Sequence, residues 1–165
     1  MDFNSQHHES TDAGTKECLI IIMGGQEYGI DILRVQEIRG YDSQNITAIA
    51  NMPEFIRGIT NLRGVIVPII DLRMKFNLAD TGYTEQTVVV VLNIHDRVVG
   101  VVVDGVSDVV NLLPEQIRDT PQFSAAISTQ YLTGIGTLGD RMLILIDIER
   151  LMSGQDMALI ERTIT

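Results

Sequence analysis

The sequence predicts an all-β protein in which two small barrels pack around a shared hydrophobic core. Hydrophobic residues make up 45% of the chain and aromatic residues only 5%, so Val, Ile and Leu must supply most of the core. These branched side chains suit a pleated sheet. Short apolar segments alternate with Gly, Pro, Asn and Asp, which is the spacing of a many-stranded β domain. The two halves of the chain also resemble each other, which indicates a duplicated unit.

Eight apolar segments are predicted to be strands, and residues 24–27 and 93–96 are predicted to be hairpin turns. The predicted strands are 18–23, 28–33, 35–40, 65–71, 88–94, 98–103, 106–111 and 142–147. Segments 88–92 and 98–103 are continuously apolar and are expected to pack against each other. Short helical runs are expected at 72–76 and 148–152, and the amphipathic stretch 156–164 predicts a closing helix.

The duplication is visible in two blocks. Gly29 and its apolar neighbours match Gly100 and its neighbours at an offset of 71 residues. Residues 55–62 match 131–138 at an offset of 76, and both copies continue to an Asp that ends a strand, Asp71 or Asp147. Chance similarity between apolar strands explains part of this match, but it explains the repeated Gly–Ile–Leu–Asp spacing less easily. Each repeat would form a closed or nearly closed barrel, because closure removes exposed strand edges.

The chain divides into a polar N-terminal tail and one folded domain. Residues 1–15 carry few apolar side chains and predict a flexible tail. The domain is expected over about 16–160, with subdomain 1 over about 16–85, subdomain 2 over about 86–152 and the C-terminal helix over about 155–164.

The net charge of −10 disfavours binding to nucleic acid or to an anionic membrane surface. Solubility alone explains this acidity better than a recognition field does. Cys18 is the only cysteine, so it cannot form an internal disulfide, and it is expected to be a small buried hydrophobe in a cytoplasmic protein. The first residues lack the basic start and apolar stretch of a signal peptide, and no apolar run approaches the roughly 20 residues of a membrane span.

Two patterns suggest chemistry at first sight. The glycines at 134, 136 and 139 fit GxGxxG, but a dinucleotide site needs that pattern between a strand and a helix, and residues 140–144 predict a strand. The glycines are therefore expected at bends or close contacts. Asp71 and Asp147 each precede a short helical run, and helix capping explains them better than a pair of catalytic carboxylates does.

No pattern predicts a catalytic, metal or cofactor site. The histidines are His7 and His8 in the tail and His95 in a predicted turn beside Asp96. No Cys/His group has the spacing of metal ligands, and no Ser or Cys has a neighbouring base. The sequence therefore predicts no enzyme activity and no cofactor.

The internal repeat offers a test for functional residues, because positions that the copies share are expected to serve the fold, and positions that differ are freer to be functional. Arg57, Asn61 and Arg63 correspond to Thr133, Thr137 and Gly139. These three alternate along the chain, so a strand would present them on one face. Val35, Glu37 and Arg39 likewise alternate along the strand predicted at 35–40. On composition alone, solvated surface charge remains the simpler explanation for both sets.

Several of these segments resemble the CheW family of chemotaxis coupling proteins. The resemblance covers about 16–160 and is carried by residues 27–33, 35–41, 57–73, 98–108, 131–134 and 140–145. It implies two SH3-like barrels of five strands each, with short helices, and a non-catalytic adaptor that couples chemoreceptors to a histidine kinase. The implied partners are the regulatory domain of the kinase CheA and the cytoplasmic tip of methyl-accepting receptors. The implied location is the cytoplasm, with recruitment to membrane-bound receptor arrays.

The resemblance also implies two sets of contact residues. The positions that match the receptor-contacting region of the family are Val35, Glu37, Gly58, Arg63, Val88 and Val109. Ile32 and Arg57 match its kinase-facing side. We therefore expect two binding surfaces and no active site.

Three alternatives are weaker. A ligand-binding or enzymatic barrel needs a polar group of side chains in its interior, and the pattern shows none. A nucleic-acid-binding SH3-like module needs a basic face with aromatic residues, which the charge and composition oppose. A fragment of a larger relative, such as the regulatory domain of the kinase, is the nearest alternative, although the length and the start at Met1 favour a separate adaptor.

Overall fold

In the computed structural model of the chain, residues 14–76, 78, 81–119, 131–152 and 158 are described. The predicted tail, 1–15, lies outside them except for its last two residues, and the predicted helix at 155–164 lies outside them except for residue 158. The elements in chain order are β1 (Lys16–Met23), β2 (Gln26–Asp31), η1 (Ile32–Arg34), β3 (Val35–Gly40), η2 (Ser43–Asn45), β4 (Ile56–Leu62), β5 (Val65–Asp71), α2 (Leu72–Lys75), β6 (Val88–Ile94), β7 (Arg97–Val103), β8 (Gly105–Leu112), η3 (Pro114–Gln116), β9 (Ile117–Arg118), β10 (Leu132–Leu138), β11 (Arg141–Ile146) and α3 (Ile148–Leu151).

All eight predicted strands and both predicted hairpin turns are present, and β6 pairs with β7 as expected. The strand predicted at 28–33 ends earlier than expected, at Asp31, because residues 32–33 form the η1 turn that Asp31 caps. The structure adds β4, β9 and β10; the glycines of β4 and β10 and the two-residue length of β9 weaken the strand pattern there. The segment with the GxGxxG pattern forms β10 and the turn into β11, so no helix follows these glycines.

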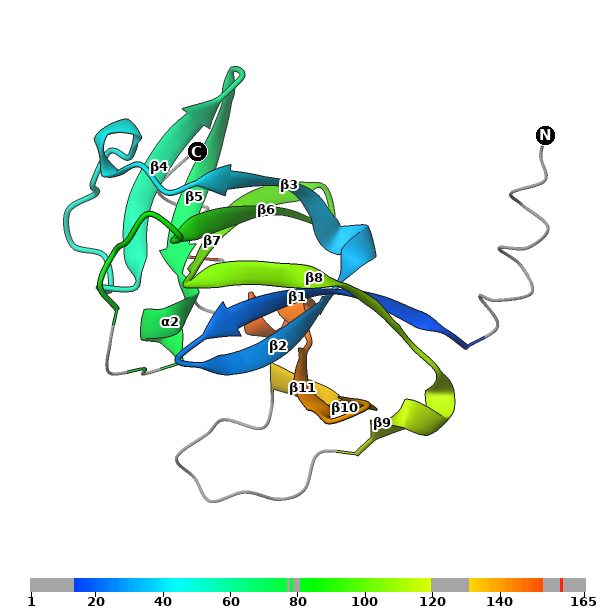
Figure 1. The fold of residues 1–165 in the computed structure, drawn as a ribbon. Coiled ribbons are helices and arrows are strands. Elements are labelled where there is room, and N and C mark those ends of the chain that lie inside the picture. The colour runs from blue at the N-terminus through cyan, green and yellow to red at the C-terminus, as the bar shows by residue number, and fades with distance from the viewer. Residues whose placement is uncertain (1–13, 77, 79–80, 120–130, 153–157, 159–165) are drawn as a thin grey trace.

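The strands form two sheets, which Figure 1 shows. Sheet A has six strands in the order β8-β1-β2-β11-β10-β9, and sheet B has five in the order β3-β6-β7-β5-β4. Neighbouring strands are antiparallel except for β2 with β11 and β5 with β7, which are parallel. The protein is therefore mostly β, as the sequence predicted.

Each sheet combines strands from both halves of the chain. In sheet A the β1–β2 hairpin of the first half pairs with β8 and β11 of the second half. In sheet B the β6–β7 hairpin of the second half lies between β3 and β5 of the first half. Equivalent strands occupy equivalent places in the two orders, so the repeat in the sequence is also a repeat in the structure. A boundary near residue 85 divides the repeats along the chain but does not divide the sheets.

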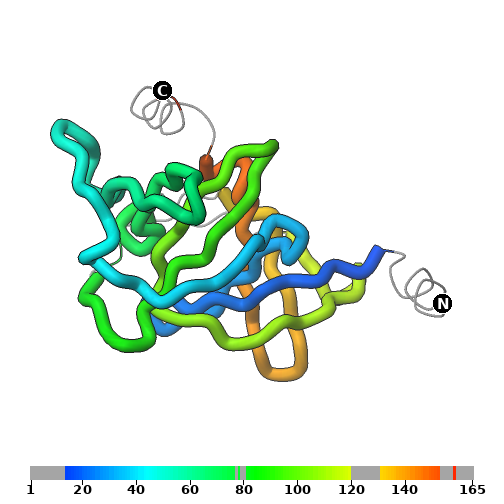
Figure 2. Tube along the Cα trace, turned by 90° about the horizontal axis from the view of Figure 1, so that it is seen from above, coloured from blue at the N-terminus to red at the C-terminus, as the bar shows by residue number. Residues whose placement is uncertain are grey.

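Three clusters of buried side chains form the core. The largest lies between the two sheets and includes Ile21 and Ile30 of sheet A with Val90 and Val101 of sheet B. Two smaller clusters fill the individual barrels, and Cys18 belongs to the one in sheet A. Burial raises the pKa of the Cys18 thiol to about 11, as a small buried hydrophobe requires. Figure 2 shows the two lobes of the chain side by side. The largest cluster contains residues of both sheets and therefore joins the lobes.

Each barrel closes through the same backbone contact. In sheet B, Thr47 and Ile59 exchange two backbone hydrogen bonds of 2.8 and 2.9 Å, and in sheet A, Arg118 pairs with Ile135. A β-bulge next to each contact coincides with a glycine, Gly58 in β4 or Gly134 in β10. A Cβ atom at Gly58 would overlap the carbonyl oxygen of Thr47, and one at Gly134 would lie 2.7 Å from that of Arg118. Both glycines are therefore needed for closure.

The predicted caps are confirmed at both repeat-equivalent aspartates. A side-chain oxygen of Asp71 accepts a hydrogen bond from the backbone N–H of Arg73, and one of Asp147 accepts from that of Arg150. Each aspartate thus satisfies an N–H group that the first turn of α2 or α3 leaves without a backbone partner. Asp71 is fully buried, whereas the side chain of Asp147 is partly exposed.

Candidate functional site

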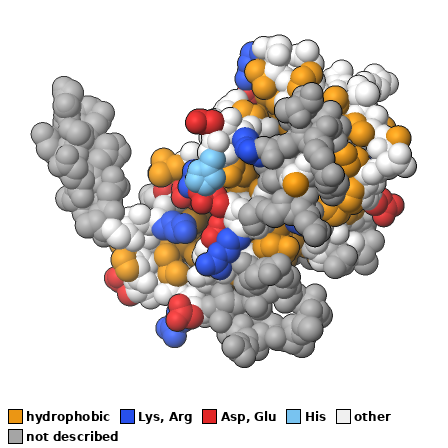
Figure 3. Space-filling view, turned by 180° about the vertical axis from the view of Figure 1, so that it is seen from behind, with side chains coloured by type: hydrophobic (Ala, Val, Ile, Leu, Met, Phe, Trp, Pro, Cys, Tyr) orange, Lys and Arg blue, Asp and Glu red, His pale blue; other side chains and the backbone are white. Residues whose placement is uncertain are grey.

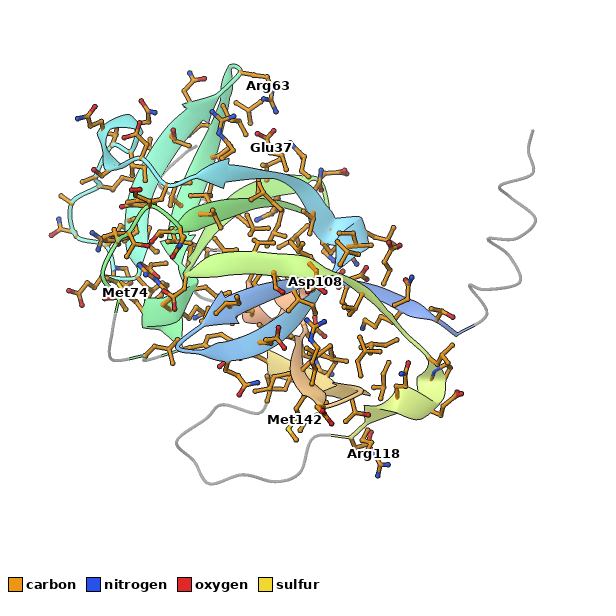
Figure 4. All side chains as sticks on the ribbon, viewed as in Figure 1. Glu37, Arg63, Met74, Asp108, Arg118 and Met142 are labelled. Atoms are coloured by element: carbon orange, nitrogen blue, oxygen red, sulfur yellow. The ribbon has the colours of Figure 1, made fainter. Side chains whose placement is uncertain are left out.

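Glu37 on β3 is the centre of a small charged cluster at one end of sheet B. Its carboxylate accepts a hydrogen bond from Arg39 at 3.0 Å and a second from Arg63 in the β4–β5 turn. Figure 4 shows Arg63 at the tip of this hairpin with Glu37 beneath it. Because β3 and β4 are the two edges of sheet B, the pair of Glu37 and Arg63 joins these edges across the barrel.

Both arginines favour the ionised form of Glu37. The hydrogen bond from Arg63 is the largest cause and that from Arg39 the second, and together they hold the pKa of Glu37 below its usual value. The cluster is open to water, since the side chain of Arg63 is 65% exposed. It is therefore an ionised carboxylate held by two exposed cations, which suits recognition of another protein better than catalysis does.

The turn that carries Arg63 is locally determined. Arg63 has a φ of 52° and is followed by Gly64 with a φ of 89°, so both residues are left-handed. The side chain of Asn61 accepts a hydrogen bond of 2.8 Å from the backbone N–H of Gly64. Two consecutive left-handed residues are typical of a tight hairpin turn, and Asn and Gly are the residues that favour it.

The strict alternation predicted for Arg57, Asn61 and Arg63 is interrupted. A β-bulge between Ile56 and Gly58 shifts the register at Arg57, and Arg63 lies in the turn beyond the strand. Asn61 and Arg63 therefore lie together at the hairpin tip, while Arg57 lies at the other end of β4. On β3 a bulge also follows Val35, but Glu37 and Arg39 share a face, as their hydrogen bond requires.

Five of the six predicted receptor-binding positions lie on sheet B or in its β4–β5 turn, but they are spread over it. Val35 on β3 and Val88 on β6 are half-buried against the shared core and lie at opposite ends of this strand pair, because Val35 pairs with Leu92 and Val88 with Gly40. Gly58 lies on β4, where barrel closure already explains its lack of a side chain. Val109 is separate from the others because it lies on β8 in sheet A, where it is 47% exposed. Its repeat equivalent, Ile38, is also exposed, at 44%.

The predicted kinase-binding positions lie on different elements from the Glu37 cluster. Ile32 begins the short η1 turn, which Asp31 caps, and it is half-buried against the shared core. Its neighbour Leu33 is 87% exposed. Arg57 lies over the ring of Tyr83, at 5.9 Å from the ring centre, and its Nη1 atom is 3.3 Å from the carbonyl oxygen of Glu54.

Sequence reasoning missed a second charged cluster, in sheet A. Arg141 at the start of β11 donates to Asp108 at 2.9 and 3.0 Å and to Glu27 at 3.0 and 3.2 Å. These bonds lower the pKa of Asp108 and raise that of Arg141. Asp108 is the repeat equivalent of Glu37, and that correspondence is the signal that could have predicted a second pair.

Sequence reasoning also missed a buried ionic network around Arg73. Arg73 is fully buried and forms ion pairs with Asp71 at 2.8 Å and with Asp104 at 2.9 Å. Its remaining donors reach the carbonyl oxygens of Thr81 and Gly82 at 3.0 and 2.7 Å. The bonds to Asp71 are the main reason why the pKa of Arg73 is raised. The repeat comparison held a signal here too, because the equivalent of Arg73 is the acidic residue Glu149.

Charged side chains also gather on the opposite face of the molecule (Figure 3). Glu149 on α3 forms an ion pair with Arg34, and its second carboxylate oxygen lies 3.4 Å from Nε2 of His95. His95 and Asp96 form the β6–β7 turn, and both have positive φ values, as expected for the predicted solvated turn. Within the described ranges, no three His, Cys, Asp or Glu side chains are grouped so that they could hold a metal ion.

The comparisons with known proteins identify the fold and the family together. The sequence matches the CheW-like domain over residues 17–156. It is 62% identical over 146 residues to the chemotaxis protein CheW of Klebsiella aerogenes, which covers 88% of this chain and 87% of that protein. The chain belongs to the CheW family.

Other CheW proteins support the same assignment. The CheW of Treponema pallidum is 32% identical over 139 residues, covering 82% of this chain and 81% of that protein. The crystal structure of the scaffolding protein TtCheW from Thermoanaerobacter tengcongensis superimposes with a TM-score of 0.76 at 31% identity, covering 86% of this chain and 94% of that chain. The CheW fold of two SH3-like subdomains and a non-catalytic scaffolding role in chemotaxis signalling are thus established for this chain. None of the helices formed by the described residues is long and apolar enough to cross a membrane.

Proposed function

We propose that this CheW-family protein joins the histidine kinase CheA to methyl-accepting chemoreceptors by binding both at once. It contacts the regulatory domain of the kinase and the cytoplasmic tip of the receptor, in the cytoplasm beneath membrane-bound receptor arrays. Family membership supports the chemotaxis role. A scaffold of this kind transmits a signal only if it binds one conformation of a partner more tightly than another, because equal affinity shifts no equilibrium.

The receptor surface comprises Val35, Glu37, Gly58, Arg63, Val88 and Val109. The single observation that best supports it is the Glu37 cluster, in which a carboxylate is fixed by arginines from β3 and from the β4–β5 turn. Fixed ionic groups recognise complementary charges with little loss of side-chain entropy. Val35 and Val88 lie at opposite ends of the β3–β6 strand pair that carries Glu37, and they would supply apolar contact on either side of the cluster.

The kinase surface includes Ile32 and Arg57. Ile32 and its exposed neighbour Leu33 lie on η1, and Arg57 lies at the end of β4 away from Arg63. Neither residue bonds to the Glu37 cluster in the described part of the chain. Separate surfaces would allow one scaffold to hold both partners simultaneously.

Two reciprocal variants test this division. Arg63→Asp reverses an exposed charge whose repeat equivalent is glycine, so the free energy of unfolding should change by no more than about 0.5 kcal/mol. Receptor binding should weaken more than about tenfold, because losing one member of a charge pair that becomes buried costs about 2–5 kcal/mol. Ile32→Glu should weaken kinase binding and spare the receptor. Each variant is assayed for melting temperature, receptor-fragment binding and kinase binding.

Arg97→Asp is the matched control, since it reverses an exposed charge beside a different hairpin turn, that of β6 and β7. It should bind the receptor fragment as the wild type does. If Arg63→Asp unfolds the protein, Arg63 is a structural residue and the repeat argument is wrong. If it folds and binds the receptor normally, the receptor surface is misplaced.

A further inference from the structure

Arg57 differs from the other arginines of the central clusters because no carboxylate pairs with it among the described residues. Arg63, Arg73 and Arg141 each bond to at least one Asp or Glu. Arg57 instead makes a long contact with the carbonyl oxygen of Glu54 and lies 3.9 Å from the sulfur of Met74. Its Nε atom is buried and has no hydrogen-bond partner in the described ranges. A half-buried guanidinium with an unused donor is costly unless something else satisfies it.

The guanidinium of Arg57 is held in place by an aromatic pair. It lies over the ring of Tyr83, and that ring stacks on Tyr41 with 4.3 Å between ring centres and 9° between planes. The hydroxyl of Tyr83 donates a hydrogen bond of 3.1 Å to the buried carboxylate of Asp71. Tyr83 is thus fixed at its face and at its hydroxyl while 40% of its surface stays exposed.

The Arg73 network fixes the backbone that carries Tyr83. Arg73 donates to the carbonyl oxygens of Thr81 and Gly82, the two residues before Tyr83, and its Cζ atom lies 4.9 Å from the Tyr83 ring centre. Arg73 also bonds to Asp104, whose second oxygen accepts from the backbone N–H of Gly24. The segment that joins the two repeats is therefore attached to α2, to the end of β7 and to the β1–β2 turn.

We propose that Arg57 binds a carboxylate of the kinase regulatory domain, that Tyr83 and Tyr41 form the platform beside it, and that Arg73 is the positioning residue for this platform. The proposal rests on the proposed function, because it takes Arg57 to face the kinase. It adds to the proposed kinase surface the chemistry of the contact and three further residues, Tyr83, Tyr41 and Arg73. A guanidinium already held on a ring loses less conformational entropy when it forms a two-pronged bond to a carboxylate.

The second repeat lacks this arrangement, which makes the site asymmetric. Thr133 stands in place of Arg57 and Glu149 in place of Arg73. The second barrel is built without an arginine at the position of Arg57, so Arg57 is available for a role outside the fold, whereas the buried Arg73 can act on a partner only by positioning Tyr83. One scaffold would offer the kinase one such carboxylate site.

The test measures the affinity of soluble kinase for the full chain as wild type and as variants. Arg57→Lys keeps the charge but loses the two-pronged geometry, and it should bind the kinase about tenfold more weakly or worse. Tyr83→Leu should weaken binding several-fold, because it removes the platform, whereas Tyr83→Phe should stay close to wild type, because it keeps the ring. The double variant Arg57→Lys/Tyr83→Leu should be little worse than Arg57→Lys, since both changes act on one contact.

Salt dependence supplies a readout that loss of stability would not change. The kinase affinity of Arg57→Gln should fall less steeply with added salt than that of the wild type, because one charge pair is gone. Arg118→Gln removes an exposed arginine that also lacks a bonded partner in the described ranges, and it should keep the wild-type slope. Melting temperatures establish that each variant is folded. The positioning role of Arg73 is tested by changing its partly exposed partner Asp104: Asp104→Asn removes one of the two ion pairs of Arg73 and should weaken kinase binding modestly.

The outcomes separate this inference from the proposed function. If Ile32→Glu weakens kinase binding while folded Arg57 and Tyr83 variants bind normally, the carboxylate site is refuted and the kinase surface stands. If none of these variants weakens kinase binding, the kinase surface itself is misplaced. If the Arg57 variants lose affinity for the receptor fragment instead of the kinase, the assigned partner is wrong.

Discussion

Glu37 and Asp108 are equivalent residues of the two repeats, and each bonds to an arginine from the hairpin that completes its barrel. Arg63 comes from the β4–β5 turn, and Arg141 comes from the first position of β11. The arginines are not at equivalent positions, since Gly139 stands in place of Arg63. The acidic residue therefore occupies an equivalent position in both repeats, whereas its basic partner does not. That difference is consistent with two barrels that recognise different surfaces.

Glu37 gives a prediction at the residue scale. Its pKa is lowered in the folded protein, so its pairing adds stability above the unfolded-state pKa of about 4.3, and this stability is lost as the pH falls through the folded-state pKa. Arg63→Gln removes the largest cause, and the pKa of Glu37 should rise toward its ordinary value. An NMR titration of the side-chain carboxyl resonances measures this shift.

Asp108 is the internal control in the same titration. Its pKa is lowered mainly by Arg141, which lies in the other sheet, so Arg63→Gln should leave it unchanged. A Glu37 pKa that does not move in Arg63→Gln would mean that this ion pair does not persist in solution.

At the scale of elements, α2 and α3 are repeat-equivalent helices that are stabilised by different contacts. Each begins after an aspartate that caps it, Asp71 or Asp147. Asp71 also pairs with the buried Arg73, whereas Asp147 makes only an exposed contact of 3.5 Å with Arg150. The aspartate therefore caps a helix in both repeats, but only in the first repeat is it also part of the buried ionic network described above.

Removing the two caps should have unequal effects. Asp147→Ala should lower the free energy of unfolding by about 1 kcal/mol, the usual cost of a lost cap. Asp71→Ala should lower it by about 3–5 kcal/mol, because it leaves the buried Arg73 with one carboxylate instead of two. Denaturant unfolding of both variants measures the difference, and equal losses would contradict the stabilising role of the network.

At the scale of the whole molecule, the strand pattern and the repeat were predictable from the sequence because alternating and continuous apolar segments are local signals. The exchange of hairpins between the sheets was not predictable from these signals. The hairpins β1–β2 and β6–β7 carry similar apolar patterns, so neither pattern specifies which half of the chain it joins.

The candidate site, like the fold, was predictable only in part. Glu37 and Arg63 were found from the repeat and the family resemblance, and the structure places them in contact. The bonds of Arg73 could not be predicted, since Asp104 lies 31 residues away in the chain and the contact depends on how β7 ends beside α2. Polar contacts between distant segments leave no periodic signal in a sequence. Bulges such as that at Arg57 likewise depend on closure of the barrel.

In the proposed function, one chain holds kinase and receptor on separate surfaces at the same time. The most direct measurement is a titration of soluble kinase into the full chain, alone and with a saturating concentration of receptor cytoplasmic fragment. We expect kinase binding to persist with the receptor fragment bound, and we expect analytical ultracentrifugation to detect a complex of all three proteins. Displacement of the kinase by the receptor fragment, with an apparent dissociation constant that rises in proportion to the fragment concentration, would contradict the proposed function.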